Sequence, residues 1–298
     1  MNPLYKRRID KVYINAPRLA IDSTSRLVLF SDCHRGNGGW GDDFYKNKNP
    51  YYAALLRYYN EGWTYVEIGD GDELWENRKI SDIIPRHADV FRLLRKFFCD
   101  NRLIMLYGNH DIEKSKKKWM DKNYSEFCNE HNGRCEDLFP GLCAHEGIVL
   151  ENKAADFEML LLHGHQADFF NDKLWRLSRF LVRYFWASLN MFGVQAPSSG
   201  SSSLSKNTNI CNRELAAYSH LRKVHLAAGH SHRPSFPQTP SEPRFFNDGA
   251  CVFPWGITCL EICGGEISLV LWQTGTGIDG IIRAERVVLE EGMPLFNS

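Results

Sequence analysis

The chain has 298 residues, of which 43% are hydrophobic and 24% are charged, a composition typical of a folded globular protein. This length predicts one large domain or two small ones, with room for a sizeable core. The 36 basic residues balance 36 acidic ones, so the net charge offers no attraction for nucleic acid, and no nucleic-acid partner is expected.

The first half of the chain predicts alternating strands and helices. Residues 1–25 are expected to be an irregular lead-in, with an edge strand at residues 12–14. A helix opened by Pro50 and an amphipathic helix around residues 81–99 separate three apolar strands. These strands cover residues 26–31, 64–68 and 102–107. Such alternation predicts a parallel sheet with crossover helices, in which ligands bind at the carboxyl ends of the strands.

A polar turn follows each of these three strands. Asp32 and His34 follow the first strand and, being two residues apart, point to the same side of the chain. Asp70 follows the second strand, and Asn109 and His110 follow the third. Because these turns meet at one edge of the predicted sheet, we expect their side chains to lie close together.

The second half of the chain has the same arrangement on further strands. A strand at residues 157–162 ends at His163, and a strand at residues 224–228 ends at His230 and His232. Four more strands with glycine turns between them are expected at residues 244–247, 256–262, 267–272 and 283–289.

For two segments the sequence allows more than one role. The lysine-rich run at residues 114–118 is expected to be the solvated face of a helix, and the alternative is a guide for an anionic substrate. Residues 173–194 predict a helix with arginines on one stripe and many leucines and aromatic residues elsewhere. This helix is either docked on the core with its arginines in water, or a hydrophobic lid or interfacial helix. A serine-rich loop at residues 198–203 and a helix around residues 213–222 follow it.

The polar strand ends supply oxygen and imidazole donors without a thiolate, which favours Mn²⁺, Fe or Zn²⁺ over a structural cysteine site. Seven donors exceed the need of one tetrahedral ion and suit two ions that share a carboxylate. Two metal ions roughly 3.5–4 Å apart stabilise both oxygens of an in-line displacement at phosphorus and generate hydroxide at neutral pH. The candidate ligands are Asp32, His34, Asp70, Asn109, His163, His230 and His232.

In this order the motifs resemble those of the calcineurin-like metallophosphoesterases. The resemblance implies a four-layer αββα sandwich of mixed α/β class around two divalent metal ions, with Mn²⁺ expected first and Fe or Zn²⁺ as alternatives. It extends over residues 26–262. The motifs that carry it are Asp32-x-His34, Gly69-Asp70, Gly108-Asn109-His110-Asp111, His163 and Gly229-His230-x-His232.

The same resemblance implies a role for each site residue. His110 would protonate or stabilise the leaving oxygen, and Asp111 would orient the His110 ring. Asn109 would face the substrate as well as a metal ion. Arg35 stands where an aliphatic residue is common, and we expect it to bind a substrate phosphate or, alternatively, to pair with an acid such as Glu73. The implied ligands are Asp32, His34 and His232 for the first metal ion, Asn109, His163 and His230 for the second, and Asp70 as the bridge.

Finer motifs resemble bacterial UDP-2,3-diacylglucosamine pyrophosphatases. They are the run at residues 69–75, the ending at residues 229–234 and the triplet at residues 247–249. The resemblance implies a single domain over residues 1–298 with a lid-like helical insertion at about residues 166–212. It also implies hydrolysis of a phosphodiester or diphosphate, with a UDP-linked lipid sugar as one candidate substrate. The alternatives are a phosphomonoesterase or nucleotidase acting on a small molecule, and a metal-free scaffold protein.

The nine cysteines are scattered along the chain. Cys128, Cys135 and Cys143 lack a C-x-x-C spacing for zinc, so free thiols are expected. Cys33 lies on the strand face opposite its two neighbouring donors, and we expect it to pack inward. No secretory segment opens the sequence and no apolar stretch is long enough to span a bilayer. A cytoplasmic location is therefore expected, with contact to the inner face of a membrane through residues 173–194.

Overall fold

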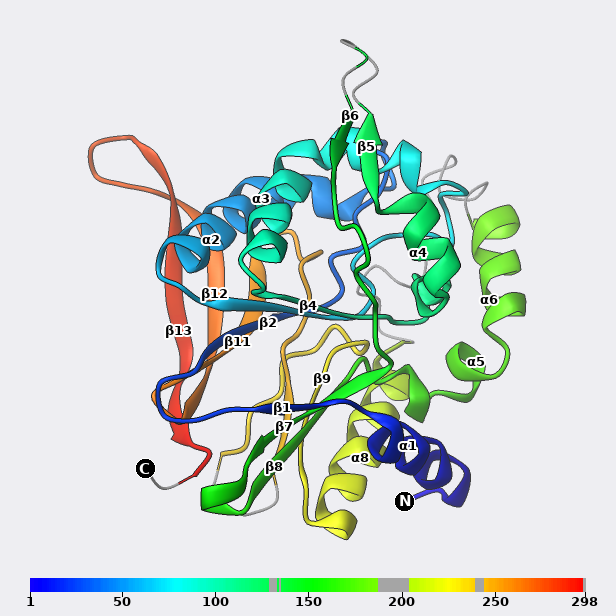
Figure 1. Cartoon of the computed structure of the whole chain (residues 1–298), viewed down its shortest axis with the longest axis vertical. Coiled ribbons are helices and arrows are strands. Elements are labelled where there is room, and N and C mark those ends of the chain that lie inside the picture. The colour runs from blue at the N-terminus through cyan, green and yellow to red at the C-terminus, as the bar shows by residue number, and fades with distance from the viewer. Residues whose placement is uncertain (129–132, 134, 187–203, 239–243, 297–298) are drawn as a thin grey trace.

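Two sheets packed face to face, with helices on both outer faces, form the core of the computed structural model (Figure 1). The structure describes residues 1–128, 133, 135–186, 204–238 and 244–296. The layers run helix, sheet, sheet, helix, which confirms the expected α/β sandwich.

The first sheet contains the three strands that precede the first polar turns. β2, β3 and β4 pair in parallel, as predicted, and β11 extends the sheet antiparallel to β2. In spatial order the sheet consists of β13 (Ile282–Pro294), β12 (Glu266–Thr276), β11 (Ile257–Cys263), β2 (Arg26–Phe30), β3 (Thr64–Ile68) and β4 (Leu103–Leu106).

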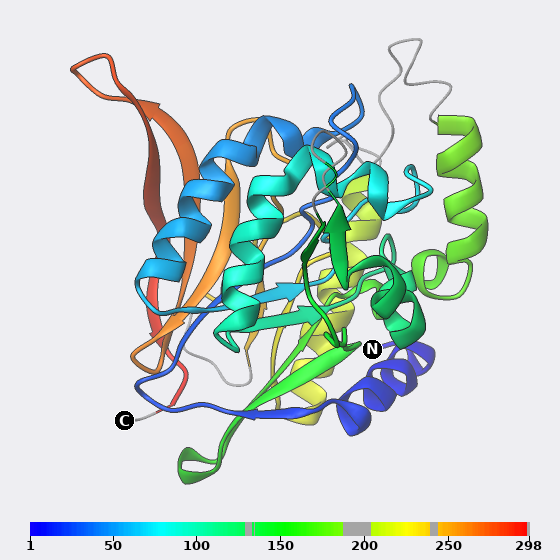
Figure 2. The ribbon, with the colours of Figure 1, turned by 45° about the horizontal axis from the view of Figure 1, so that its top comes forward.

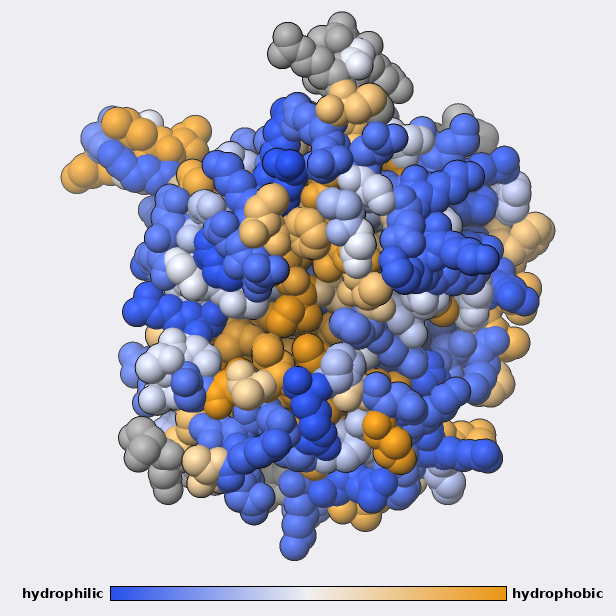
Figure 3. All heavy atoms as spheres, in the orientation of Figure 1, coloured by the Kyte–Doolittle hydropathy of each residue, from blue (hydrophilic) through white to orange (hydrophobic). Residues whose placement is uncertain are grey.

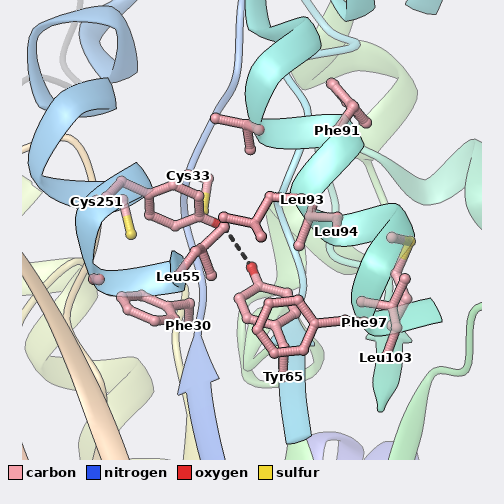
Figure 4. Packing of buried hydrophobic residues seen from close by; sticks show 14 of the residues in the cluster. Phe30, Cys33, Leu55, Tyr65, Phe91, Leu93, Leu94, Phe97, Leu103 and Cys251 are labelled. Atoms are coloured by element: carbon pink, nitrogen blue, oxygen red, sulfur yellow. Dashed lines mark hydrogen bonds between the residues drawn. The ribbon is translucent and has the colours of Figure 1, made fainter. Parts of the chain in front are cut away.

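Two helices, α2 (Lys48–Asn60) and α3 (Ala88–Cys99), lie side by side over the outer face of this sheet (Figure 2). They bury apolar side chains spaced three and four residues apart, which is the spacing of one helix face. Figure 4 shows Phe30 and Tyr65 from the sheet packed among Leu55 and Phe97 from the two helices. The buried Tyr65 hydroxyl has hydrogen-bond partners in the Tyr51 hydroxyl at 2.6 Å and the Glu67 carboxylate at 3.3 Å.

The second sheet carries the polar turns of the second half of the chain. β8, β9 and β10 pair in parallel, and β7 pairs antiparallel to β8. α1 (Pro3–Asn15) and α8 (Leu204–Arg222) cover its outer face. In spatial order the sheet consists of β1 (Arg18–Ala20), β7 (Gly147–Asn152), β8 (Phe157–Leu162), β9 (His225–Ala228) and β10 (Phe245–Asn247).

An apolar layer between the two sheets fixes their relative position. Leu29 and Val66 from the first sheet belong to the same buried cluster as Leu150 and Leu161 from the second. Because burial of such side chains contributes roughly 1.5–3 kcal/mol each, the layer holds the carboxyl ends of both sets of parallel strands at one edge.

The edge strand expected at residues 12–14 is wrong, since these residues belong to α1. The side chain of Asn2 accepts a hydrogen bond from the Leu4 N–H and caps the helix, and Pro3 occupies its first turn. Ile9 and Val12, three residues apart, face the second sheet. Capping and a helical spacing of two apolar residues therefore outweigh the strand preference of a short apolar run.

The expectation of free thiols is wrong for Cys135, which is disulfide-bonded. It lies in a small hairpin of β5 (Glu126–Cys128) and β6 (Cys135–Asp137), directly opposite Cys128 in the strand register. This hairpin follows α4 (Lys117–Asn123). Cys33 is free and fully buried in the apolar cluster under α2 and α3, as expected.

Within the helix expected at residues 173–194, the structure has α6 (Trp175–Leu181), which a π-helical turn extends to Trp186. A short helix, α5 (Phe169–Asp172), precedes it. Residues 187–194 and the serine-rich loop at residues 198–203 lie outside the described residues. α8 resumes at Leu204, earlier than the helix expected around residues 213–222. In the part of the chain that the structure describes, no helix combines the length and hydrophobicity needed to cross a membrane.

Candidate metal centre

The seven candidate ligands converge at the edge where the parallel strands of both sheets end. The first sheet supplies four of them, from the turns after β2, β3 and β4. The second sheet supplies the other three, from the turns after β8 and β9. The position of each donor therefore follows from its place directly after a buried strand, as the sequence predicts.

The donors form two groups in which the ligand atoms lie within 4.8 Å of one another. One group is Asp32, His34 and His232, and the other contains His163 and His230 with Asp70. His232 Nε2 lies 3.1 Å from Asp32 Oδ1, and His163 Nε2 lies 3.1 Å from Asp70 Oδ2.

The two groups also touch each other. His34 Nε2 lies 3.8 Å from Asp70 Oδ2, and His163 Nε2 lies 3.9 Å from Asp32 Oδ1. The histidines and aspartates are grouped as the resemblance implies, with Asp70 near both groups. The role of Asn109 as a ligand stays a prediction.

Asp32 and Asp70 each use one carboxylate oxygen for hydrogen bonds within the protein and direct the other toward the histidines of the centre. Asp32 Oδ2 accepts hydrogen bonds from the His230 N–H at 2.8 Å and from the Ser31 hydroxyl. Asp70 Oδ1 accepts the His110 N–H at 2.8 Å. The other oxygen of each carboxylate remains directed at the histidines. The fold thus orients both carboxylates with backbone donors before any ligand binds.

Three fully buried donor atoms at the centre have no hydrogen-bond partner within the protein. They are Asp32 Oδ1, Asn109 Oδ1 and His163 Nε2. A buried polar atom without a partner costs about 1–3 kcal/mol, so three together require an explanation. Divalent cations bound by these oxygen and nitrogen atoms would satisfy all three, and the donor set fits such ions.

Five of the donors occupy left-handed backbone conformations, which are unfavourable for residues other than glycine. Conformations of this kind cost about 1–3 kcal/mol each and are found where function requires them. The φ angles are 48° for Asp32, 47° for His34, 51° for Asp70, 65° for His230 and 53° for His232. The turns after β2, β3 and β9 are therefore shaped to direct side chains and not for local stability.

Glycines beside the ligands allow the turns to approach one another. A Cβ atom added to Gly108 would lie 2.1 Å from Asp70 Oδ1, and one added to Gly229 would lie 2.1 Å from the Ser31 hydroxyl. Both distances are far below van der Waals contact, so any side chain at these positions would displace a ligand carboxylate or its hydrogen-bond donor.

The titration of the centre reflects concentrated negative charge. Burial opposes ionisation of Asp70, but the adjacent His163 and His110 rings overcome it and hold the pKa of Asp70 far below its usual range. Burial lowers the pKa of His163, yet the Asp70 and Asp32 carboxylates outweigh it and raise the pKa of His163 to about 9. His165 is different, because burial and the neighbouring His163 and His230 rings hold its pKa well below 6.5. The protonated form of His163 is thus favoured at the centre, whereas the protonated form of His165 is disfavoured.

Glu73 links the centre to His110, a role that the sequence reasoning missed. Its carboxylate lies 2.8 Å from His34 Nδ1 and 2.7 Å from His110 Nδ1. Burial opposes ionisation of Glu73, but His110 and His34 hold its pKa well below the usual value. A charged Glu73 therefore orients both rings and leaves each Nε2 free for the centre.

Trp75 supports His110 and the backbone of Asn109. Its ring stacks on His110 with the ring centroids 4.0 Å apart, and its Nε1–H donates to the Asn109 carbonyl at 2.7 Å. Glu73 and Trp75 belong to the run at residues 69–75 that carries the finer resemblance. The run was therefore visible in the sequence, although the contacts of its side chains were not.

The expectation that Asp111 orients His110 is wrong. The Asp111 carboxylate accepts the backbone N–H groups of Gly71 at 2.9 Å and of Gly108 at 2.7 Å, and it pairs with Lys114 at 2.7 Å. It thereby fastens the turn after β3 to the turn after β4. Its contribution to the site is the position of the two turns and not the orientation of the imidazole.

The expectation that Arg35 binds a substrate phosphate is also wrong. Arg35 is fully buried and pairs with Asp72 at 2.8 Å and with Glu67 at 2.7 Å, so a substrate cannot reach it. The alternative of an ion pair is correct in kind, with Glu67 and Asp72 as partners in place of Glu73.

Lys114 completes this buried network, so the expected solvated face of the lysine-rich run is wrong for Lys114 and confirmed for Lys116, Lys117 and Lys118, which are exposed. Lys114 is fully buried and lies 2.7 Å from Asp72 and 3.1 Å from Glu67, in addition to its contact with Asp111. Burial lowers its pKa, but Asp111 and Asp72 outweigh the effect and hold the pKa well above 10.5. Glu67, Asp72 and Asp111 also lie close enough to hold a metal ion, but Arg35 and Lys114 already neutralise them.

Two contacts tie the helical insertion to the centre. Asp168 caps α5 through the N–H groups of Phe170 and Asn171, and its second oxygen lies 3.4 Å from His230 Nε2. Burial opposes ionisation of Asp168, but His230 outweighs it and lowers the pKa of Asp168 to about 2. At the other end, Arg183 donates to the Trp75 carbonyl at 2.7 Å. The capping position of Asp168 was readable from the sequence, but its contact with a residue 62 positions later was not.

Replacing Glu73 by glutamine tests its hold on the two rings. We expect Glu73→Gln to lower the affinity for Mn²⁺ about 10–100-fold, because it removes the carboxylate that orients His34. Titration calorimetry measures the affinity, and Glu76→Gln is the matched control, since no hydrogen bond links its carboxylate to either ring in the described structure. Equal affinities of the wild type and Glu73→Gln would contradict this role.

Removing Lys114 tests the buried ion network. Lys114→Met leaves three buried carboxylates with one cation, and we expect a loss of about 3–5 kcal/mol in the free energy of unfolding. Urea denaturation in the presence of a chelator measures this loss. The control is Lys117→Met, because Lys117 pairs with Asp121 at the exposed surface and such pairs contribute about 0–1 kcal/mol. Equal effects of the two changes would show that the network is not needed for stability.

The chain is distantly similar to several solved structures. No curated protein matches the chain. A predicted phosphoesterase from Streptococcus pneumoniae TIGR4 has 15% identity and a TM-score of 0.32, over 89% of this chain and 97% of its own. Vps29 from Chaetomium thermophilum has 13% identity and a TM-score of 0.39, over 91% and 100%. A cold-active protein-tyrosine phosphatase from a psychrophilic Shewanella species has 12% identity and a TM-score of 0.37, over 90% and 81%.

A family model identifies the family of the chain. The model described as calcineurin-like phosphoesterase matches residues 25–234, which is more than half of the chain and includes every candidate ligand. With that match and the layered fold that brings these ligands together, the chain belongs to the calcineurin-like phosphoesterase family.

Proposed function

We propose that this phosphoester hydrolase uses two divalent metal ions, with Mn²⁺ as the first candidate, to cleave phosphodiester or diphosphate bonds. The observation that supports this most directly is the pair of facing donor groups with three unpartnered buried ligand atoms. One ion would be held by Asp32, His34 and His232, and the other by Asn109, His163 and His230. Asp70 would contact both.

The metal ions, when bound, would withdraw charge from the phosphoryl oxygens and supply hydroxide at neutral pH. The residues of the chain have separate tasks. The two aspartates and the left-handed turns fix the site before substrate arrives, which saves reorganisation during the reaction. Asn109 would face the substrate phosphate as well as the second ion.

His110 is the residue that handles the leaving group in this proposal. Glu73 engages its Nδ1 and Trp75 stacks on its ring, so Nε2 is the atom available to donate a proton to the departing oxygen. Its side chain is 16% exposed, so it lies at the mouth of a centre whose aspartates are buried.

We favour a phosphoryl group with a single negative charge, as in a diester or a disubstituted diphosphate, over a monoester dianion. Arg35 and Lys114, which lie near the ligand-bearing turns, are buried and paired with carboxylates. Neither is free to balance the additional charge of a phosphomonoester dianion. The motifs shared with UDP-2,3-diacylglucosamine pyrophosphatases support a lipid-linked nucleotide as one candidate substrate, and a cytoplasmic location is part of the same proposal.

Two chromogenic esters test this function. With Mn²⁺ loaded, we expect faster turnover of bis-p-nitrophenyl phosphate than of p-nitrophenyl phosphate, and loss of both activities after the metal is stripped. A preference for the monoester would favour the alternative of a phosphomonoesterase or nucleotidase. Failure to bind any metal would contradict the proposal and favour a scaffold protein.

A change at His110 tests the leaving-group role. We expect His110→Ala to keep its metal content and to lose about 10²–10⁴-fold in kcat, as for the loss of a general acid. Metal analysis and turnover of the diester measure the two quantities. Turnover at the wild-type rate in a metal-loaded variant would exclude His110 from the reaction.

A further inference from the structure

The helix α6 is oriented opposite to the arrangement that normally buries a helix. Arg179, and Arg183 in the turn that follows, contact the protein, whereas Leu177, Phe180 and Leu181 are exposed. We call the exposed apolar side chains the insertion face. It consists of Phe170, Leu174, Leu177, Phe180, Leu181 and Tyr184.

The insertion face is prominent for side chains of this kind. Leu177 is 52% exposed and Phe180 is 57% exposed. In Figure 3, hydrophobic atoms project at the right-hand margin, where Figure 1 places α6. Scattered exposed apolar residues are ordinary, but a contiguous row on one helix indicates a surface that is covered in use.

Specific contacts hold α6 in this orientation. Arg179 pairs with Glu113, and Arg183 donates to the Leu74 carbonyl at 2.8 Å as well as to that of Trp75. Arg78 donates to the Tyr184 hydroxyl at 3.0 Å. These contacts anchor the helix, because turning it over would break the bonds of Arg179 and Arg183 to the protein.

The sequence from Lys173 through α6 to Arg213 contains basic residues and no acidic ones. The next acid after Asp172 is therefore Glu214. Lys173 and Arg176 are exposed beside the insertion face. Lys173 lies 3.6 Å from Asp172, and Arg176 lies over the Trp175 ring. Exposed apolar side chains flanked by cations match the chemistry of an anionic lipid surface.

We propose that the insertion face docks on the surface of an anionic lipid bilayer, with its apolar side chains among the acyl–headgroup boundary and its cations at the lipid phosphates. A second copy of this chain fits the face less well. In a two-fold symmetric dimer, the face would lie against itself and bring Lys173 and Arg176 close to the same cations of the partner.

Docking at this face would place the catalytic centre at the lipid surface. Asp168 at the start of the insertion contacts His230, and Arg183 at its end holds the turn that carries Glu73 and Trp75. Resting on the proposed function, this geometry specifies the substrate class as amphiphilic phosphodiesters or diphosphates whose head group leaves the membrane plane to reach the centre.

Vesicle binding tests the docking without any need for turnover. The metal-loaded protein is sedimented with vesicles of phosphatidylglycerol and phosphatidylcholine, and with vesicles of phosphatidylcholine alone. We expect binding to the anionic vesicles that falls at least about tenfold in the variant Leu177→Glu/Phe180→Glu. The matched control is Ile278→Glu, since Ile278 is fully exposed on the β12–β13 hairpin, across the molecule from α6 in Figures 1 and 2. This control is expected to bind as the wild type does.

The outcomes separate the docking from the proposed function. Absence of binding to anionic vesicles, or binding that is equal in the double variant, would overturn the docking proposal. If light scattering shows a dimer for the wild type and a monomer for the double variant, the insertion face binds a second copy of the chain instead. Turnover of bis-p-nitrophenyl phosphate by the double variant at the wild-type rate is expected in every case in which the proposed function holds. If the metal-loaded wild type does not turn over bis-p-nitrophenyl phosphate, the proposed function is contradicted, and the vesicle-binding result still decides the docking proposal.

Discussion

Neutralisation of buried negative charge is the constraint on which the rest of this structure depends. Glu67, Asp72 and Asp111 lie beneath the centre without access to water, and Arg35 and Lys114 neutralise them from within the fold. Such pairs are weak evidence for stability, because desolvation opposes the attraction. Their value here is positional, since Arg35 also joins the turn after β2 to the turn after β3 through its backbone. The ligands of the centre are borne on turns that this network holds in register.

Next to this ion network, the short run that contains Glu73 and Trp75 orients side chains of the metal centre. Glu73 aligns two imidazoles, and Trp75 supports His110 and the Asn109 backbone. Arg183 then fixes the carbonyl groups of the same run from the insertion. Catalytic positioning and the outward orientation of α6 therefore share one element, so the geometry of the centre and that of the exposed face are not independent.

The strand ends and the grouping of donors were predictable because both follow from local rules. An apolar run followed by a polar turn indicates the end of a buried strand, and parallel strands bring such ends together. What failed were interpretations that depended on long-range partners. Arg35, Asp111 and Lys114 have their roles set by carboxylates and backbone groups that no local pattern reveals. The helix in place of a strand at residues 12–14 shows the same limit, since its capping signal at Asn2 was present but the apolar triplet was given more weight.

The left-handed turns at the centre have a consequence for the folding of the chain. Five strained residues concentrate unfavourable backbone energy at one point, and three buried donor atoms beside them have no partner in the protein. A cation that binds there stabilises the native turns but gains little from the unfolded chain, so binding and folding are linked through mass action. The folded fraction of the protein then depends on the concentration of free metal. Shortage of metal would reduce the amount of folded protein as well as its catalytic rate, which makes the abundance of the chain itself responsive to metal supply.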